Sequence, residues 1–331
     1  MDALSEVLQA IRLDGAVYLD AEFTAPWCIE AQFGLHTVTE HLPRSDHVAF
    51  FHVLTEGTCR ARLVGGEEVL DLQAGDIVMF PHDHPHLMGS DVSLAPAAED
   101  DIVETQGDSG MFRMRLGGGG AATRFVCGYL ACDRRVCRPL FSALPRMLRV
   151  SIGNDATWLL EMLRVGVHES TARGPGARSL LAKLAELMFV EAIRRFAAAQ
   201  PPEQKGWLAG LRDRHVGRAL ALLHGRPAHS WTVDDLAREV ALSRSVFAER
   251  FVELIGEPPM QYLTRWRLAL AAQRLRTGVE TIGRIAERIG YESEAAFNRA
   301  FKREFGMPPS AWRRSVRDVD AGTGTDEPTA V

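Results

Sequence analysis

The sequence predicts an α+β protein of two domains: an N-terminal antiparallel β-barrel with helices, followed by an all-α domain that contains two helix-turn-helix units in tandem. Three observations support this prediction. Short β-like runs separated by Gly and Asp turn signals occupy residues 47–88, as in an antiparallel barrel or sandwich. Helical periodicity replaces them beyond Pro139. A helix-turn-helix pattern then occurs twice in the C-terminal third.

The composition is compatible with two packed domains and argues against a membrane protein. The chain has 331 residues, of which 46% are hydrophobic. Its first residues lack the basic flank and apolar run of a signal peptide, and no window approaches the roughly 18 apolar residues of a membrane span. We therefore expect a cytoplasmic protein with no membrane partner. Five cysteines, an odd number, fit a reducing compartment better than a disulfide framework.

The formal net charge of -5 is unevenly distributed along the chain. Residues 206–317 contain 19 Lys+Arg and 12 Asp+Glu, whereas residues 1–205 contain 19 and 27. A basic C-terminal module is what phosphate binding requires, because electrostatic attraction acts over about a Debye length and not over the whole chain.

The predicted elements follow one another from strands to helices. After the strands of residues 47–88, further strands are expected at Met111–Leu116 and Thr123–Leu130, separated from the earlier ones by an acidic loop at Asp91–Asp108. Long helices are expected at Ala156–Val167 and Ala177–Ala199. The predicted segments are a barrel domain (1–140), a helical connector and candidate dimerisation region (141–205) with a linker at 203–210, a helix-turn-helix domain (206–317; units at about 233–254 and 282–305) and a disordered tail (318–331).

The repeated motif runs from LAREV to GEPP in the first copy and from IAERI to GMPP in the second. Two copies are too few for a stacked solenoid, so we interpret them as two DNA-reading units. Thr232 and Ser243 cap the two helices of the first unit, and Ser293 caps the second helix of the second unit. The second helix of such a unit enters the major groove. Its outward positions are Arg244, Ser245, Ala248 and Glu249 in the first unit, and Glu294, Ala295, Asn298, Arg299 and Lys302 in the second.

These outward residues differ in what they offer to DNA. Arg299 is the strongest candidate for a base contact, because Arg pairs bidentately with guanine, and Asn298 suits a phosphate or an adenine. The two alanines offer only apolar contact, as to a thymine methyl. Glu249 can accept from cytosine N4 or can simply be exposed. Arginines on the connecting helix Met260–Thr277 either form a solvated face or contact phosphate; they are Arg265, Arg267, Arg274 and Arg276.

The segment IAERIGYESEAAFNRAFKREFGMPPSAWRR carries the Ile-Ala, Gly-Tyr, Phe, Phe-Lys, Gly and Pro pattern that is typical of the AraC/XylS family of transcriptional regulators. The resemblance covers Val216 to Arg314. The stretch from Leu144 to Trp231 resembles the subgroup whose N-terminal sensor is a cupin, so the resemblance implies a cupin-like barrel for the first domain.

A metal-binding cupin supplies two His and a Glu from one motif and a third His from a second motif. Here His52, Glu56 and His86 occupy three of these four positions, whereas Phe50 replaces a His; Asp83 also stands where the pattern has a Gly. His52 and His86 are therefore candidate ligands for zinc or iron, with Glu56 and His84 as further effector-site or metal candidates. In the alternative, these histidines line a small-molecule pocket or bond to backbone carbonyls.

Cysteines suggest a second kind of sensor. Cys28 and Cys127 are candidate redox residues, because arginines near Cys127 in the sequence would favour a thiolate. The alternative is that each is a small buried hydrophobe.

Taken with the resemblance, the sequence predicts a sequence-specific transcriptional regulator, an activator that responds to an effector or to stress, and not an enzyme. The expected partners are promoter DNA, RNA polymerase, a small-molecule or oxidant effector and a second copy of the chain. The alternatives are a metal-dependent cupin enzyme fused to a DNA-binding domain, which the missing fourth ligand disfavours, and an architectural DNA protein, which the large sensor domain disfavours.

Overall fold

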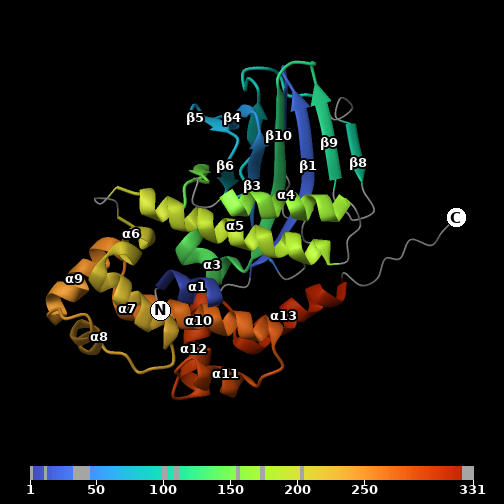
Figure 1. The fold of residues 1–331 in the computed structure, drawn as a ribbon. Coiled ribbons are helices and arrows are strands. Elements are labelled where there is room, and N and C mark those ends of the chain that lie inside the picture. Colours follow the sequence, from blue (N-terminus) through green and yellow to red (C-terminus); the bar gives the residue numbers. More distant parts are fainter. Residues whose placement is uncertain are drawn as a thin grey trace.

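The structure is a computed structural model that describes residues 3–10, 13–32, 45–98, 103–106, 112–153, 157–171, 176–201 and 205–322. Figure 1 shows the strands in one half of the molecule and the C-terminal helices in the other. The architecture confirms the predicted α+β class, with a β-rich first domain and a helical second domain.

Two sheets form the first domain. The larger sheet has the order β11-β6-β3-β10-β1-β9-β8, and the smaller has the order β2-β7-β4-β5. Every described pairing is antiparallel except that of β1 with β9, which is parallel. The strands are β1 Asp14–Thr24, β2 Cys28–Ala31, β3 His47–Glu56, β4 Thr58–Leu63, β5 Val69–Gln73, β6 Asp76–Phe80, β7 His86–Gly89, β8 Val103–Gln106, β9 Phe112–Gly117, β10 Ala122–Cys132 and β11 Leu148–Ser151.

Several of these strands differ from the sequence prediction. β1 and β2 lie in a region for which no strand was predicted, and β8 lies in the segment Asp91–Asp108 that was predicted as a loop. β11 lies inside the predicted helical connector, where it pairs with β6. The connector is therefore part of the sheet at its start and helical only afterwards.

Two helices of the connector cross the strands (Figure 1). They are α4, Thr157–Thr171, and α5, Ala177–Ala199, whose bounds match the predicted helix. α5 packs on β1 and on α4, and it buries Leu181, Leu184, Met188 and Phe189 in the main core. Burying side chains of this size stabilises by about 1.5–3 kcal/mol each.

The C-terminal domain is entirely helical within the described residues. The predicted linker at 203–210 is partly helical, because α6 begins at Trp207. The last helix continues to Gly322 and so extends past the predicted start of the tail, whose residues 323–331 lie outside the described part. The helices are α6 Trp207–Arg212, α7 Arg214–Gly225, α8 Val233–Glu239, α9 Arg244–Ile255, α10 Pro259–Thr277, α11 Ile282–Arg288, α12 Glu294–Phe305 and α13 Pro309–Gly322.

The predicted N-caps are confirmed. Thr232 forms a capping box with Asp235 at the start of α8, and Ser243 accepts a hydrogen bond from the backbone N–H of Val246 in α9. Ser293 accepts from the N–H of Ala296 at the start of α12. These bonds satisfy N–H groups that a helix cannot satisfy internally, so each cap fixes where a reading helix begins.

The two helix-turn-helix units pack into different hydrophobic cores. Phe247 and Phe251 of the first unit belong to the main core, which also contains sensor residues such as Leu140 and Phe189. Phe297 and Phe301 of the second unit belong to a separate cluster, formed with residues of α10, α11 and α13. The first unit is thus packed continuously with the sensor, whereas the second unit has a core of its own.

The turns of the two units also differ in backbone strain. Ala241 has a φ of 56°, whereas the corresponding Gly290 has a φ of 84°. An L-residue in this left-handed region costs roughly 1–2 kcal/mol, and glycine avoids that cost. We expect Ala241→Gly to raise the free energy of unfolding by up to about 1 kcal/mol, measured by urea denaturation.

The reverse change at the second turn provides the comparison. A Cβ added at Gly290 would lie 2.5 Å from the carbonyl oxygen of Ala228, so Gly290→Ala is expected to destabilise the protein. If Ala241→Gly lowered the denaturation midpoint, the first turn would not be strained.

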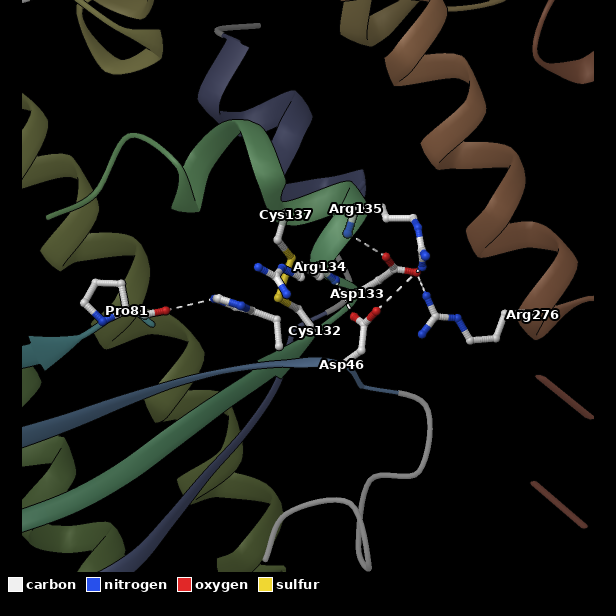
Figure 2. The surroundings of a disulfide bond; sticks show 9 residues. Asp46, Pro81, Cys132, Asp133, Arg134, Arg135, Cys137 and Arg276 are labelled. Atoms are coloured by element: carbon white, nitrogen blue, oxygen red, sulfur yellow. Dashed lines mark hydrogen bonds and ion pairs between the residues drawn. A yellow bond between two sulfur atoms is a disulfide. The ribbon is translucent and has the colours of Figure 1, made fainter. Parts of the chain in front are cut away.

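A short helix of the sensor, α3 (Arg134–Phe141), joins the two domains (Figure 2). Asp133 caps α3 and forms a buried ion pair with Arg276 of α10. The guanidinium of Arg135 lies 4.2 Å from the ring centroid of Trp312 and 5.2 Å from that of Phe305. α3 therefore contacts both the connecting helix and the end of the second reading helix.

The same junction contains a disulfide, between Cys132 and Cys137. The odd cysteine count did not predict this pair. The reason is local: β10 ends at Cys132 and α3 begins two residues later, so the chain folds back and brings the two Cα atoms within 6.8 Å. Cys28, Cys59 and Cys127 are free and buried.

A second contact between the domains comes from the start of the chain. The helix α1, Ala3–Ala10, packs on α7 of the DNA-binding domain. Val7 of α1 is fully buried in the main core, together with Leu220 and Leu223 of α7. In Figure 1, α1 lies beside the C-terminal helices rather than among the strands. This first helix of the predicted sensor segment, 1–140, therefore contacts the reader directly.

Candidate nucleic-acid interface and sensor interior

The second unit presents the most available positive charge. On α12, Arg299 and Lys302 are exposed, and neither forms an ion pair or side-chain hydrogen bond within the described part of the chain. Asn298 is half-buried beside them. Phe297 and Phe301 point into the core on the opposite side. A capped helix with this division can place its polar face in a major groove.

The two flanking candidates on α12 are Glu294 and Ala295. The Glu294 carboxylate lies beside Gly283, in the first turn of α11, where a Cβ on that glycine would be 2.8 Å from Oε2. A carboxylate is stabilised at such a helix start. Ala295 is exposed. Of the predicted contact residues on this helix, Asn298, Arg299 and Lys302 therefore remain as the polar candidates that lie away from α11.

The first unit is chemically different. Arg244 forms an ion pair with Asp234 of α8 at 3.1 Å. Ser245 and Glu249 are exposed, and Ala248 is half-buried. To reach a base, Arg244 would first have to leave its carboxylate partner. The two reading helices are therefore alike in backbone and unequal in available charge.

The four arginines of the connecting helix form ion pairs or hydrogen bonds with other residues of the protein. Arg265 pairs with Glu257, Arg274 with Glu280, and Arg276 with Asp133. Arg267 donates to the carbonyl oxygens of Pro227 and His229 at 2.6 and 2.7 Å. In this structure these side chains join parts of the protein, and neither sequence interpretation, solvated face or phosphate contact, describes them.

In the sensor, β3 and β7 bring His52 and His86 together, with 2.9 Å between their Nε2 atoms. The Nδ1 atom of His52 lies 2.7 Å from the Sγ of Cys127, its register partner on β10. The Nδ1 atom of His86 lies 3.0 Å from the carbonyl oxygen of His84. The side chains of His52, His86 and Cys127 are all buried.

These contacts form one consistent chain of hydrogen bonds. The Cys127 thiol donates to His52, the Nε2–H of His52 donates to His86, and the Nδ1–H of His86 donates to the His84 carbonyl oxygen; we assign the tautomers from this network. Burial keeps both imidazoles neutral, since it lowers the pKa of His52 far below its usual range and that of His86 to about 4. The cluster is a satisfied polar core.

The other two candidates of the sensor are placed elsewhere. The Glu56 carboxylate, half-exposed, pairs with Arg124 at 2.8 Å. The ring of His84 faces His82, with centroids 5.8 Å apart. Asp83, which stands where the cupin pattern has a glycine, has a φ of 53°, so the turn keeps the glycine-like backbone.

This donor set does not fit a zinc or iron ion. A protein metal site needs about three converging ligands, whereas the Nε2 atoms of His52 and His86 face each other and Cys127 lies on the opposite ring nitrogen. Within the described residues, no group of three or more His, Cys, Asp or Glu is arranged to hold a metal.

The candidate redox cysteines have raised, not lowered, pKa values. Burial raises the pKa of Cys28, and it raises that of Cys127 far above its usual range. They lie on different sheets, Cys28 on β2 and Cys127 on β10. Reactive cysteines require the opposite environment. Arg124, near Cys127 in sequence, is instead paired with Glu22 and Glu56.

The neutral histidine pair predicts a loss of stability in acid. Above pH 6.5, His86 is neutral in both the folded and the unfolded chain, so its shifted pKa has no effect. As the pH falls from 6.5 towards 4, the unfolded chain takes up a proton that the folded chain does not, so the free energy of unfolding decreases. We expect a contribution of about 2 kcal/mol at about pH 5.

Urea denaturation at pH 7.5 and pH 5 measures this effect. A His86→Gln variant should lose less stability between the two pH values than the wild type, whereas replacing the exposed His229 by Gln should leave the difference unchanged. Equal acid sensitivity in the wild type and the His86 variant would contradict the assignment.

Sequence reasoning identified the histidine pair but missed the residues at the domain junction. No sequence motif includes Asp133, Arg135 or Arg276. Their contacts join β10, α3 and α10, which lie far apart in the sequence. The only sequence signal was the N-cap position of Asp133 before a helix.

Among the described residues, no helix is long and apolar enough to span a bilayer.

Comparisons with known proteins show the same two parts. Residues 2–198 match the family model described as Cupin, and residues 236–315 match the model described as Helix-turn-helix domain. A chain described as an AraC-like transcription regulator from Streptomyces lividans is 34% identical over 315 residues, which cover 95% of this chain and 98% of that one.

Two other relatives are similar over nearly their whole length. The regulator AlkR of Acinetobacter baylyi is 30% identical, with 95% of this chain and 99% of AlkR covered. The RCS-specific activator RclR of Escherichia coli is 27% identical, with coverage of 96% and 99%. Among solved structures, the DNA-binding domain of AdpA in complex with a target DNA matches 32% of this chain and 95% of its own, at 29% identity and a TM-score of 0.31.

Proposed function

This chain belongs to the AraC-like transcription regulators with an N-terminal cupin domain, and from that premise we propose that it binds an asymmetric promoter site and responds to an effector through its sensor. Sequence-specific DNA binding is the role of the family, and the chain is a DNA-binding regulator. One observation supports the asymmetry: within the described residues Arg299 and Lys302 of the second unit form no ion pair, whereas Arg244 of the first unit is paired with Asp234.

The experiment is a selection of bound fragments from genomic DNA with the purified full chain, followed by gel shifts on the enriched sequence. We expect a non-palindromic site, here called the operator, with the stronger base dependence under the second unit. Specific binding should exceed non-specific binding by 10³-fold or more. Enrichment of no common sequence would refute the proposal.

Activation and effector response are further parts of the proposal. An effector can act only through different affinities for two arrangements of the protein, and the contacts of α3 with α10, α12 and α13 provide such a coupling surface. Run-off transcription with RNA polymerase on the operator tests the direction, and less transcript in the presence of the chain would identify a repressor. The names of the relatives support a regulator over the alternative of a metal-dependent cupin enzyme fused to a DNA-binding domain, and turnover of a small substrate by the chain would favour that alternative.

We also propose a homodimer through α4. Trp158, Met162 and Val165 follow one another at helical spacing on its surface and are 52%, 41% and 50% exposed. Apolar side chains in such a row indicate a partner surface, and we take the partner to be a second copy of the chain.

Met162→Glu should shift the chain towards the monomer in sedimentation velocity, because a charge in an apolar interface is unpaired. Val279→Glu is the control, since Val279 is 92% exposed and lies outside this row. A dimer of unchanged stability in the Met162 variant would place the interface elsewhere.

A further inference from the structure

A cavity of about 760 Å³ lies where the sensor meets the DNA-binding helices. One wall is α3 of the sensor. The other walls include Ile255, the last residue of α9, the first half of α10, and Phe305, the last residue of α12. The cavity therefore touches the sensor, the connecting helix and the ends of both reading helices.

Aromatic side chains line much of this cavity. Trp207, Tyr262 and Trp266 are all buried and contribute to its wall. Such rings favour stacked or edge-on contact with another ring. The lining therefore suits a ligand with a flat aromatic body.

Two donors of the lining are available to a negatively charged group. Arg138 of α3 is exposed and forms no ion pair within the described residues. The buried Nε1–H of Trp266 also finds no acceptor there. Arg265 is paired with Glu257, and Arg135 with Asp46 at 3.6 Å, so among the described residues Arg138 is the arginine of the lining without an ion pair, and Glu304 is the carboxylate of the lining without one. A negative group can accept hydrogen bonds both from the unmatched N–H of Trp266 and from the unpaired guanidinium of Arg138.

We propose that this cavity binds a small aromatic anion, whose ring packs among the tryptophan and tyrosine rings and whose negative group accepts hydrogen bonds from Arg138 and from the Nε1–H of Trp266. The site is distinct from the buried histidine cluster in the sensor interior. Its regulatory meaning rests on the proposed function, because such a ligand would bridge α3 and the helices that hold the two readers and thereby stabilise their docked arrangement.

Calorimetric titration of the full chain with 2-naphthoate tests the site. We expect saturable binding, weakened about tenfold or more by Arg138→Gln, since a hydrogen bond to a charged group is lost. The uncharged 2-naphthalenemethanol should bind more weakly than 2-naphthoate by a similar factor. The matched control is Arg134→Gln, which removes a neighbouring exposed arginine of α3 that does not line the cavity.

Trp266→Phe gives a second reading, because it removes the Nε1–H and keeps an aromatic ring. It should weaken 2-naphthoate binding several-fold, and the Arg138 variant decides the matter if the phenylalanine variant does not fold. Absence of saturable binding, or equal affinity in the wild type and Arg138→Gln, would overturn the proposal. Gel shifts without 2-naphthoate test DNA binding separately, so failure of the proposed function is distinguishable from failure of this site.

Discussion

Replacing Arg299 by alanine should weaken operator binding about 10-fold to 100-fold, in line with the 1–3 kcal/mol typical of a bidentate arginine–guanine contact. The reason is structural. Arg299 stands exposed on a capped reading helix and has no ion-pair partner in the described part of the chain. Its whole hydrogen-bonding fork is available to a base. Gel shifts at fixed salt on the operator, and on operators altered at single base pairs, measure both the loss and the position at which specificity relaxes.

Arg244→Ala is the matched control in the first unit. Because Arg244 is already paired with Asp234 at 3.1 Å, DNA must compete with that carboxylate, and we expect a smaller loss of affinity. Thermal melts should show both variants folded, since both side chains are exposed. If Arg244→Ala abolished binding while Arg299→Ala had no effect, the assignment of the stronger contacts to the second unit would be wrong.

Phe301→Ala should cost about 3–5 kcal/mol of stability, as for other buried phenylalanines. Phe301 is fully buried, with ring centroids of Phe297 and Phe305 at 5.5 and 4.3 Å. The second unit has its own core, so we expect this unit to unfold before the rest of the chain. Urea denaturation followed by far-UV circular dichroism should then show two steps instead of one.

Val279→Ala is the large-to-small control for this prediction. Val279 is 92% exposed, and its truncation should leave the denaturation curve unchanged. A single transition at the wild-type midpoint for Phe301→Ala would show that the separate cluster adds little to stability.

The elements that sequence analysis predicted well are those with strong local signals. Helix caps such as Ser243 and Ser293 depend only on residues that are close together in the sequence. The same holds for the long apolar periodicity of Ala177–Ala199. β1 was missed although it carries a readable alternation of Val17, Leu19, Ala21 and Phe23, all of which are buried.

Other features depend on partners that lie far away in the chain. The arginines of α10 look like a basic surface in the sequence, yet Arg267 bonds to carbonyl oxygens of the loop before α8, and Arg276 to Asp133 of the sensor. Cys127 meets His52 only because β10 and β3 pair in one register. No local pattern specifies these contacts, since tertiary packing decides them.

The docking of α1 on α7 has a consequence for how the protein is made. Residues 3–10 leave the ribosome long before their partner, residues 214–225, which emerges only after the residues of the sensor between them have been synthesised. Until then Leu4, Val7 and Leu8 lack the apolar surface that covers them in the native state. Contacts of such long sequence separation form late and leave apolar side chains open to aggregation.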